Sequence, residues 1–511
     1  MREALRARRR RPWRLAVLVA ILTAWTGTAV WHSNKPMPPG TNVDAPWQPV
    51  PVSSVRLIAD VTTADGYGRP ILNHAIFDEV LAIVRSAREF LVLDYFLFND
   101  HKGSVEPGSA PLRPLSAELR EALLERRREV PQIQILFITD PINDVYGGDP
   151  SQDLALLRGA GVQVVITDLD RLRDSNLIYS SLWRLTMSWW SGDGRGEGWL
   201  PNPFSAENSP VTLRAWARLA NFKANHRKVI LGDDGRGGLV GIVTSANPHD
   251  ASSAHSNIAV RISGRVLEPL LASELAIARF SGWQGELNLP ATFAGELLPV
   301  RNPGSMATAD PGFVRVKVLT ERAIRTAVLE RVGAAARGEA IDIAMFYLSD
   351  RAIIESLLAA SRRGVAVRLI LDPNKDAFGR AKSGIPNRPV ASELVAASDG
   401  AIRVRWYRTH GEQFHTKLVM VRGTDTTWMT LGSANLTRRN IGGYNLEANI
   451  AIEAPAGSPL ALQAREYFDA LWNNEAPPGV EYTADFGVYA DPAQSRYWLY
   501  RILEGTGLST F

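Results

Sequence analysis

The feature that most constrains this sequence is an internal repeat, because the same order of helical and strand patterns occurs twice. In each half a helical pattern precedes an apolar strand, and a second helix follows with a strand that ends in Asp-Pro. The matched strands are 89–98 with 340–348, 133–141 with 365–373, and 161–168 with 401–408. Alternating strands and helices predict an α/β fold whose sheets are covered by helices. Two tandem copies predict a pseudo-two-fold molecule, with any shared site at the interface between the copies.

Two of the eight histidines stand at matched positions in this repeat. His226 is followed by Lys228 and Asp233, and His415 is followed by Lys417, each motif opening an apolar run of strand character. Residues two apart in a strand lie on one face, so we expect each histidine beside its lysine. One imidazole can attack phosphorus while the other, protonated, gives its proton to the leaving oxygen. The lysines already compensate the phosphate charge, so we expect neither a metal ion nor another cofactor.

A small polar turn follows each motif at nearly the same distance. Residues 244–247 begin 18 positions after His226, and residues 432–435 begin 17 positions after His415. Hydroxyl and amide groups in these turns are neutral donors suited to phosphoryl oxygens. The candidate phosphate-binding residues are Ser245, Asn247, Ser433 and Asn435.

The twin motifs resemble the HKD motifs of the phospholipase D superfamily, and the resemblance covers about residues 56–511. The string Asn-His-Arg-Lys at 225–228 is similar in particular to that of bacterial cardiolipin synthases and related phosphatidyltransferases. The resemblance implies two tandem phospholipase D-like α/β domains and a double displacement through a phosphohistidine. It implies that His226 is the nucleophile and His415 the general acid. It also implies a phosphate held by Lys228, Lys417, Asn247 and Asn435.

The second motif departs from the family pattern, because Arg422 stands where an aspartate is expected. Glu447 resembles the acidic position that orients a motif histidine in several relatives. Matching the strings at 255–260 and 447–452 places His255 where the second half has Glu447. A carboxylate that fixes the imidazole tautomer is what this chemistry needs. We therefore expect an asymmetric, active site with one acidic partner in each half, Asp233 in the first and Glu447 in the second.

The remaining candidates for chemistry have a structural interpretation. Asp140 and Asp372 end equivalent strands before a proline and are expected to cap those strands. Six histidines lack a motif lysine and are expected to be exposed or structural, namely His32, His74, His101, His249, His255 and His410.

The two halves differ most in an aromatic insertion at about 169–216, which holds five of the 14 tryptophans. Within it Ile178, Leu182, Leu185 and Trp189 recur at helical spacing. Such a helix could dip into a membrane interface, and the alternative is that it packs on the core of the protein. The expected organisation is a basic segment with anchor or signal peptide (1–34), a Pro-rich linker (35–55), domain 1 (56–290), a linker (291–314) and domain 2 (315–511).

The formal charge of +4 divides unevenly along the chain. Seven arginines against one glutamate give residues 1–14 a charge of +6, which leaves −2 for the rest. An uncharged run follows at 15–31, long enough to approach the span of a bilayer. The basic flank predicts a transmembrane anchor with the catalytic body on the extracytoplasmic side, and a cleaved signal peptide is the alternative. Six prolines in residues 35–54 predict an extended tether.

These observations favour a phospholipase D-type phosphodiesterase or phosphatidyltransferase acting on membrane phospholipids. The absence of cysteine excludes thiolate nucleophiles and Cys-ligated metals. The alternatives are a nuclease of the same superfamily and an inactive binding module. A nuclease normally presents a basic surface, so the charge of −2 argues against nucleic acid as a partner. Because both motifs lie in one chain, we expect a monomer.

Overall fold

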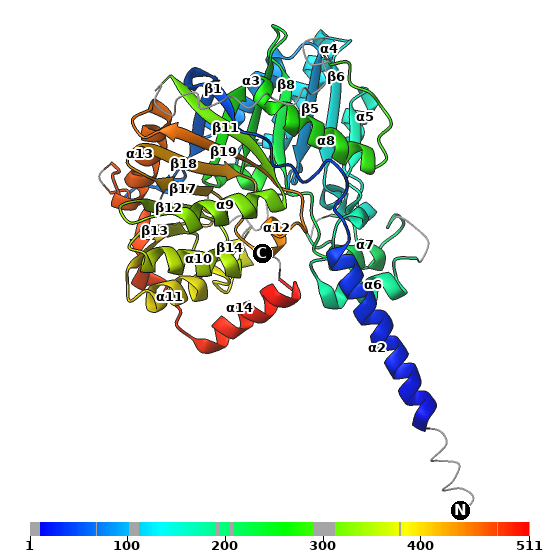
Figure 1. Ribbon diagram of the computed structural model, residues 1–511. Coiled ribbons are helices and arrows are strands. Elements are labelled where there is room, and N and C mark those ends of the chain that lie inside the picture. Colours follow the sequence, from blue (N-terminus) through cyan, green and yellow to red (C-terminus); the bar gives the residue numbers. More distant parts are fainter. Residues whose placement is uncertain are drawn as a thin grey trace, which may run out of the picture.

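The computed structural model describes residues 11–67, 69–101, 112–189, 194–204, 208–289, 312–377, 380–477, 479–509 and 511 of the chain. Within them the strands form two large sheets, one built from residues 55–263 and the other from residues 313–485 together with one strand at 48–51 (Figure 1). Three parts of the sequence predictions lie outside the described residues. They are residues 1–10 of the basic segment, residues 190–193 and 205–207 of the aromatic insertion, and residues 291–311 of the expected linker.

The first sheet has seven strands in the order β2-β10-β9-β8-β5-β6-β7. Its strands are β2 (Val55–Asp60), β5 (Phe90–Tyr95), β6 (Gln134–Thr139), β7 (Gln163–Ile166), β8 (Lys228–Asp233), β9 (Leu239–Thr244) and β10 (Asn257–Ser263). The helices of this half are α3 (Ala75–Ser86), α4 (Leu115–Glu129), α5 (Gln152–Gly159), α6 (Leu177–Thr186), α7 (Leu213–Leu219) and α8 (Glu268–Phe280). A separate two-stranded sheet pairs β3 (Thr63–Ala64) with β4 (Pro70–Ile71).

The second sheet has nine strands in the order β1-β11-β19-β18-β17-β12-β13-β16-β20. Its strands are β1 (Gln48–Pro51), β11 (Phe313–Thr320), β12 (Ala340–Met345), β13 (Ala366–Leu371), β16 (Ile402–Tyr407), β17 (Lys417–Arg422), β18 (Thr426–Gly432), β19 (Ala448–Pro455) and β20 (Thr483–Asp485). The helices of this half are α9 (Arg322–Ala334), α10 (Arg351–Arg362), α11 (Asn387–Ala397), α12 (Arg438–Ile441), α13 (Pro459–Asn473) and α14 (Gln494–Thr506). A short pair joins β14 (Asp376–Ala377) to β15 (Arg380–Ala381).

The two sheets repeat one topology, which confirms the expected pair of α/β units. Strands β5, β6 and β7 run parallel and are linked through helices, as are β12, β13 and β16. The motif strands β8 and β17 lie antiparallel beside β5 and β12. The seven strands of the first sheet follow the order of β11 to β16 in the second, with β1 and β20 added at the edges.

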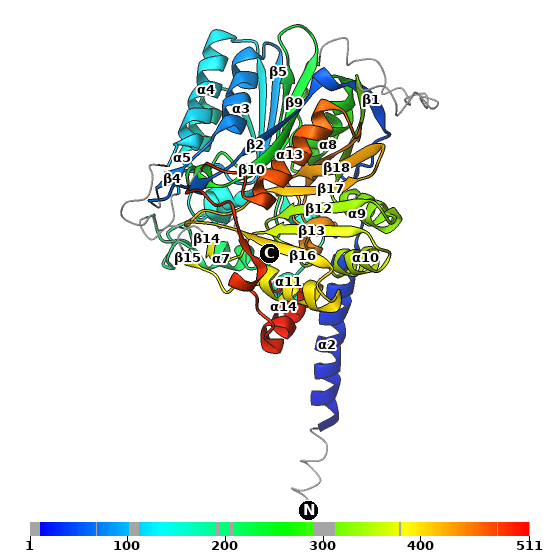
Figure 2. The ribbon, with the colours of Figure 1, turned by 90° about the vertical axis from the view of Figure 1, so that its left-hand side faces the viewer.

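A shared hydrophobic core joins the two halves. It contains buried residues from both sheets, such as Val92 and Leu231 from the first and Leu418 and Ile450 from the second. Helices α8 and α13 contribute to this core, whereas α3, α4 and α5 cover the first sheet and α9, α10 and α11 cover the second (Figure 2). The interface between the halves is therefore a packed interior, and polar groups placed there are shielded from water.

One helix at the N-terminal end projects from this body. Helix α2 (Arg11–Asn34) extends away from both sheets (Figure 1), and within its segment Trp13–Asn34 an 18-residue window has a mean hydropathy of 1.6. By length and composition this segment can cross a membrane.

The Pro-rich segment that follows α2 differs from the expected extended tether. Thr41 is fully buried, and its backbone oxygen accepts hydrogen bonds from Arg227 and Ser273. A few residues later β1 pairs with β11 at the edge of the second sheet. The prolines permit an extended strand, and the neighbouring sheet edge captures it, so the segment is part of the folded body.

The aromatic insertion contains α6, which lies beside α2. Trp25 Nε1 of α2 donates a hydrogen bond to the backbone oxygen of Ile178 at 3.1 Å. Trp183 is buried, whereas Ile178, Leu182 and Trp189 are exposed. One face of the insertion therefore packs on the protein, as one of the two alternatives predicts. The other face is apolar and exposed, and its entry into a membrane interface stays a prediction.

Candidate active site

The two histidine motifs lie at the interface between the two halves of the chain. One residue separates His226 from the start of β8. The backbone N–H of His226 donates a hydrogen bond to the backbone oxygen of Leu446 at 2.9 Å. His415 stands in the same relation to β17, and its N–H donates to the oxygen of Ser256, also at 2.9 Å. Each histidine is therefore held by a segment of the opposite half, and the two contacts are related by the pseudo-two-fold symmetry.

Glu447 is the partner of His226 and comes from the other half of the chain. Nδ1 of His226 lies 2.9 Å and 3.1 Å from the two carboxylate oxygens of Glu447. Ser433 and Asn440 also donate hydrogen bonds to this carboxylate. Because Nδ1 is engaged, Nε2 is the ring nitrogen that remains available for chemistry.

Asn257, rather than an acid, occupies the same place beside His415. Nδ1 of His415 lies 3.1 Å from Oδ1 of Asn257, and Ser245 donates to that oxygen at 3.0 Å. The residues before these partners, Ser256 and Leu446, make the matching backbone contacts, so Asn257 is equivalent to Glu447. The sequence match that placed His255 there is wrong by two residues. His255 instead lies beside the ring of His415, with centroids 5.8 Å apart.

Each motif lysine lies against its histidine. Lys228 Nζ and Lys417 Nζ donate to the backbone oxygens of their own motif histidines at 2.8 Å and 2.9 Å. Phe96 and Phe346 follow β5 and β12, and the lysine nitrogens lie 5.2 Å and 5.3 Å from their ring centroids. The same rings lie 4.9 Å and 5.0 Å from the imidazole centroids. The histidine, lysine and phenylalanine thus form one repeated unit.

The two strand-ending aspartates position the motifs. Oδ2 of Asp140 accepts a hydrogen bond from the backbone N–H of Asn225 at 2.7 Å, and Oδ2 of Asp372 accepts one from Phe414 at 2.8 Å. Both carboxylates also cap the residues after their own strands. Burial raises the pKa of Asp140 to about 8 and that of Asp372 to about 6. They act as capping residues, and in addition they fix the residue before each histidine.

The four predicted phosphate-binding residues fall into two pairs. Ser245 and Ser433 donate to Asn257 and Glu447 and also accept backbone hydrogen bonds, so their hydroxyl protons point at the histidine partners. The Oδ1 atom of Asn247 accepts a hydrogen bond from the backbone of Leu97 at 3.2 Å. The buried Oδ1 atom of Asn435 has no hydrogen-bond partner in the described part of the chain.

The structure places Asp233 away from His226, contrary to the expected partnership. Asp233 ends β8, five residues beyond Lys228, which at about 3.3 Å per residue separates the strand ends by roughly 16 Å. Its carboxylate accepts backbone hydrogen bonds from Arg88, Glu89 and Phe90 and so anchors the start of β5. In the second half Arg422 occupies this strand end and pairs with Asp342 at 2.6 Å. Both residues therefore stabilise strand ends and do not orient an imidazole.

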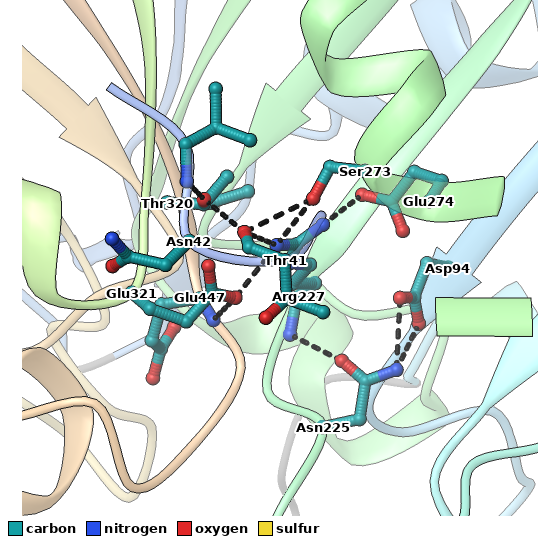
Figure 3. Close-up of polar contacts among 12 residues, drawn as sticks. Thr41, Asn42, Asp94, Asn225, Arg227, Ser273, Glu274, Thr320, Glu321 and Glu447 are labelled. Atoms are coloured by element: carbon teal, nitrogen blue, oxygen red, sulfur yellow. Dashed lines mark hydrogen bonds and ion pairs between the residues drawn. The ribbon is translucent and has the colours of Figure 1, made fainter. Parts of the chain in front are cut away.

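A buried ionic network lies under the first motif, and the sequence reasoning missed it (Figure 3). Arg227 is fully buried and pairs with Glu274 at 3.0 Å and with Glu321 at 2.6 Å. Its guanidinium also donates to Ser273 and to the backbone oxygen of Thr41. A usable signal was present: Arg227 lies between two site residues, so its side chain faces away from them and into the core.

The network reaches Glu447, the partner of His226, through the backbone. Oε1 of Glu321 accepts a hydrogen bond from the N–H of Glu447 at 3.2 Å. On the other side Asn225 donates to both oxygens of Asp94 at 2.8 Å (Figure 3). Burial raises the pKa of Glu321 to about 7, against the opposing charge of Arg227. In the second half Thr416 replaces the arginine and contacts Tyr467 at 3.1 Å.

Burial dominates the electrostatics of the site. It lowers the pKa of His226 to about 4, against the opposing effect of Glu447, and it lowers the pKa of His415 well below its ordinary value. It lowers the pKa of Lys228 to about 7 and that of Lys417 well below its usual range. Burial alone would raise the pKa of Glu447, but His226 and Lys228 hold it below its ordinary value. An anion that enters would restore the charge of the lysines.

The described residues contain no group of three His, Asp or Glu side chains placed to hold a metal ion. The chemistry available from these residues is that of two imidazoles, two lysines and two amide side chains. This set can form and break bonds at phosphorus while compensating the charge of the phosphoryl oxygens.

The chain is similar to several known proteins. The family model described as "Cardiolipin synthase, PLD-like domain" matches residues 329–472. Cardiolipin synthase B of Shigella flexneri is 27% identical over 242 residues, covering 45% of this chain and 52% of that protein. Cardiolipin synthase B of Escherichia coli K12 is 26% identical over 241 residues, with the same coverage. The chain spans about half the length of these relatives.

A solved structure has the same overall fold. Phosphatidylserine synthase of Haemophilus influenzae Rd KW20 superposes with a TM-score of 0.55, covering 94% of this chain and 96% of that chain. The sequence identity is 9%, so the likeness concerns the fold.

Proposed function

We propose that this chain is a member of the phospholipase D superfamily and that it acts as a membrane phosphatidyltransferase. The observation that carries the proposal is the paired site at the interface between the halves. There His226 and His415 each have a motif lysine and a partner supplied by the opposite half.

In the first step Nε2 of His226 attacks the phosphorus of a phospholipid phosphodiester. The bond from phosphorus to the alcohol oxygen breaks as the P–N bond forms, and His415 gives its proton to that oxygen. Glu447 balances the positive charge of the phosphorylated imidazole through Nδ1. Lys228 and Lys417 compensate the negative charge of the phosphoryl oxygens, and Asn247 and Asn435 donate further hydrogen bonds to these oxygens.

In the second step an alcohol attacks the phosphohistidine and gives its proton to His415. The P–N bond breaks, and His226 returns to its neutral form. A lipid hydroxyl as acceptor gives a new phosphodiester, and a phosphatidylglycerol acceptor would give cardiolipin, the product named in the relatives. Water as acceptor gives hydrolysis by the same route.

The lipid substrate class is supported by the surroundings of the site. Helix α2 is long and apolar enough to cross a bilayer, and α6 beside it exposes an apolar face. The relatives named as cardiolipin synthases support the same class. The arginines before α2 favour retention of that end in the cytoplasm, so the catalytic body lies on the extracytoplasmic side. One chain holds both motifs, so a monomer suffices.

Product analysis tests this proposal. The full chain is reconstituted in vesicles containing labelled phosphatidylglycerol, with and without added ethanol, and the lipid products are separated. We expect cardiolipin and free glycerol, and phosphatidylethanol when ethanol is present. His226→Ala should reduce turnover about 10⁴-fold, and His415→Ala about 10²- to 10⁴-fold.

The matched control is Arg85→Ala, an exposed position on α3 that should leave turnover unchanged. Unchanged turnover in both histidine variants would contradict the mechanism. Cleavage of labelled single-stranded DNA without lipid turnover would instead identify the chain as a nuclease.

A further inference from the structure

A second polar cavity lies outside the paired histidine site. It has a volume of about 440 Å³, within the range of small-ligand sites. Its walls come from the end of α2 and from the helices α9, α10, α12 and α14. No motif histidine or lysine lines it. The cavity is therefore separate from the groups that we assign to catalysis.

The cavity is strongly basic although the folded body as a whole is not. Six arginines against two acids give its lining a formal charge of +4. The arginines are Arg173, Arg322, Arg325, Arg351, Arg438 and Arg501. Such a concentration of guanidinium groups suits an anion with several oxygens, above all a phosphate.

Most of this positive charge is not neutralised locally. Asp350 pairs with Arg325 at 2.9 Å, and Arg351 pairs with Glu393 at 2.6 Å. Within the described ranges, the guanidinium groups of the other four arginines have no carboxylate partner; these are Arg173, Arg322, Arg438 and Arg501. The second acid, Glu504, is occupied by hydrogen bonds from Ser349 and from the backbone of Arg438.

The position of the cavity relative to α2 indicates the source of the phosphate. Ser33 and Asn34, the last residues of α2, line the cavity. Trp13 and Trp31 are exposed and 18 residues apart, which corresponds to about 27 Å along a helix and is close to the thickness of a bilayer core. Tryptophans mark the two interfaces of a membrane span, so the cavity lies at the level of the lipid headgroups.

Two helices with exposed apolar side chains lie at the same end of the body. Helix α6 contacts α2, and α14 also lies at this end in both views (Figures 1 and 2). The exposed fractions are 71% for Trp189 after α6, and 58% for Trp498 and 56% for Ile502 on α14. These side chains can enter the outer part of a bilayer beside α2.

We propose that this cavity binds the phosphate headgroup of an anionic phospholipid of the bilayer that α2 crosses. The acyl chains remain in the bilayer beside α2, and the bound lipid holds the body against the membrane. The cavity is linked to the catalytic centre by the short helix α12. Arg438 at its start lines the cavity, and Asn440 donates a hydrogen bond to Glu447. A lipid bound in the cavity therefore contacts α12, the helix whose Asn440 donates a hydrogen bond to the carboxylate of Glu447.

Native mass spectrometry of the full chain in a zwitterionic detergent tests this site. All variants carry His226→Ala, so that lipid is not consumed. The probes are dioleoylphosphatidylglycerol, dioleoylphosphatidylcholine and inorganic phosphate. We expect one tightly bound phosphatidylglycerol whose Kd rises at least about ten-fold in Arg322→Ala/Arg501→Ala. The charge-preserving Arg322→Lys/Arg501→Lys should bind more tightly than the alanine pair.

The matched control is Arg85→Ala/Arg236→Ala, which removes two exposed arginines that do not line the cavity, one in the last turn of α3 and one between β8 and β9, and should bind as the parent does. Equal binding of phosphatidylglycerol by the alanine pair and the control would overturn the proposal, as would equal affinity for phosphatidylcholine. Displacement of the lipid by equimolar inorganic phosphate would show a site for soluble phosphate and would also overturn it. The assay reads binding without turnover, so its failure is distinct from failure of the proposed transferase function.

Discussion

The His226 and His415 centres occupy equivalent places in the two halves, yet only His226 receives a carboxylate. Glu447 stands beside His226, whereas the amide of Asn257 stands beside His415. Strand order, lysine position and aromatic ring are all repeated. The comparison teaches that the backbone keeps the symmetry while the charges do not. Two histidines with different proton affinities suit a reaction in which one attacks phosphorus and the other transfers a proton.

The same contrast extends beneath the motifs. Arg227 and its acids form a buried ionic network in the first half, and Thr416 with Tyr467 takes the equivalent place in the second. Glu321 of this network accepts a hydrogen bond from the backbone N–H of Glu447. The network around Arg227 therefore helps to hold Glu447, the carboxylate that the second half supplies to His226. The two asymmetries are therefore physically connected.

The largest expected effect distinguishes the buried ionic network around Arg227 from the Thr416–Tyr467 contact that takes the equivalent place in the second half. Arg227→Met leaves Glu274 and Glu321 without their cation and should destabilise the fold by about 3–5 kcal/mol, whereas Thr416→Val should cost about 1 kcal/mol. This deficit should grow as pH rises above about 7. In the parent, Glu321 has a folded-state pKa of about 7 with Arg227 present, so its ionisation stops costing stability above that pH. Without Arg227 the folded-state pKa of Glu321 is higher still, so Arg227→Met keeps losing stability where the parent no longer does.

Guanidinium denaturation followed by tryptophan fluorescence measures this difference. Adding Glu321→Gln to Arg227→Met should recover part of the loss, because one buried carboxylate is removed. Equal midpoints for Arg227→Met and Thr416→Val would show that the network contributes nothing specific.

A smaller effect is expected when the two centres are made alike. Glu447→Gln gives both histidines an amide partner and should lower kcat about 10- to 100-fold, because nothing then balances the charge on His226. Its counterpart Asn257→Ala should lower kcat less, since it removes a neutral partner. Steady-state turnover of labelled phosphatidylglycerol measures both. A greater loss in Asn257→Ala would reverse the assignment of the two histidines.

The smallest effect is a shift of the pH profile. Burial and the charge of Lys417 lower the pKa of His415, and Asn257→Asp should raise it by about one unit by placing a carboxylate at Nδ1. A general acid is active below its pKa, so activity that falls with rising pH should fall about one unit higher in the variant. The pH dependence of kcat measures this. A profile that moves to lower pH would contradict the role of His415 as general acid.

The repeat and both motifs could be predicted from sequence because helices and strands impose different periods on the apolar residues. The partner of His415 could not. Sliding 255–260 onto 447–452 is an error of two residues, and a shift of two keeps every side chain on its own face of the strand. The alternation therefore fits both registers equally well, and only the backbone contacts of Ser256 and Leu446 distinguish them.

Long-range partners were beyond the sequence for a different reason. The spacing of Asp233 from its motif suggested a catalytic partner, but the carboxylate has its hydrogen-bonding partners at the start of β5. Arg227 lay in view within the motif, yet its partners come from α8 and from the residue before α9, about 50 and 95 positions away. A short stretch of sequence predicts which way a side chain points, but it does not predict which residues far along the chain that side chain contacts.

The burial of Thr41 has a consequence for how this molecule meets its substrate. It lies seven positions after Asn34, the last residue of α2, a reach of about 25 Å even when fully extended. With α2 in a bilayer, this short connection keeps the folded body close to the membrane surface and prevents it from tumbling freely. Under the proposed function, lipid substrates would then arrive by lateral diffusion, so turnover would follow their mole fraction within the membrane and be independent of their bulk concentration.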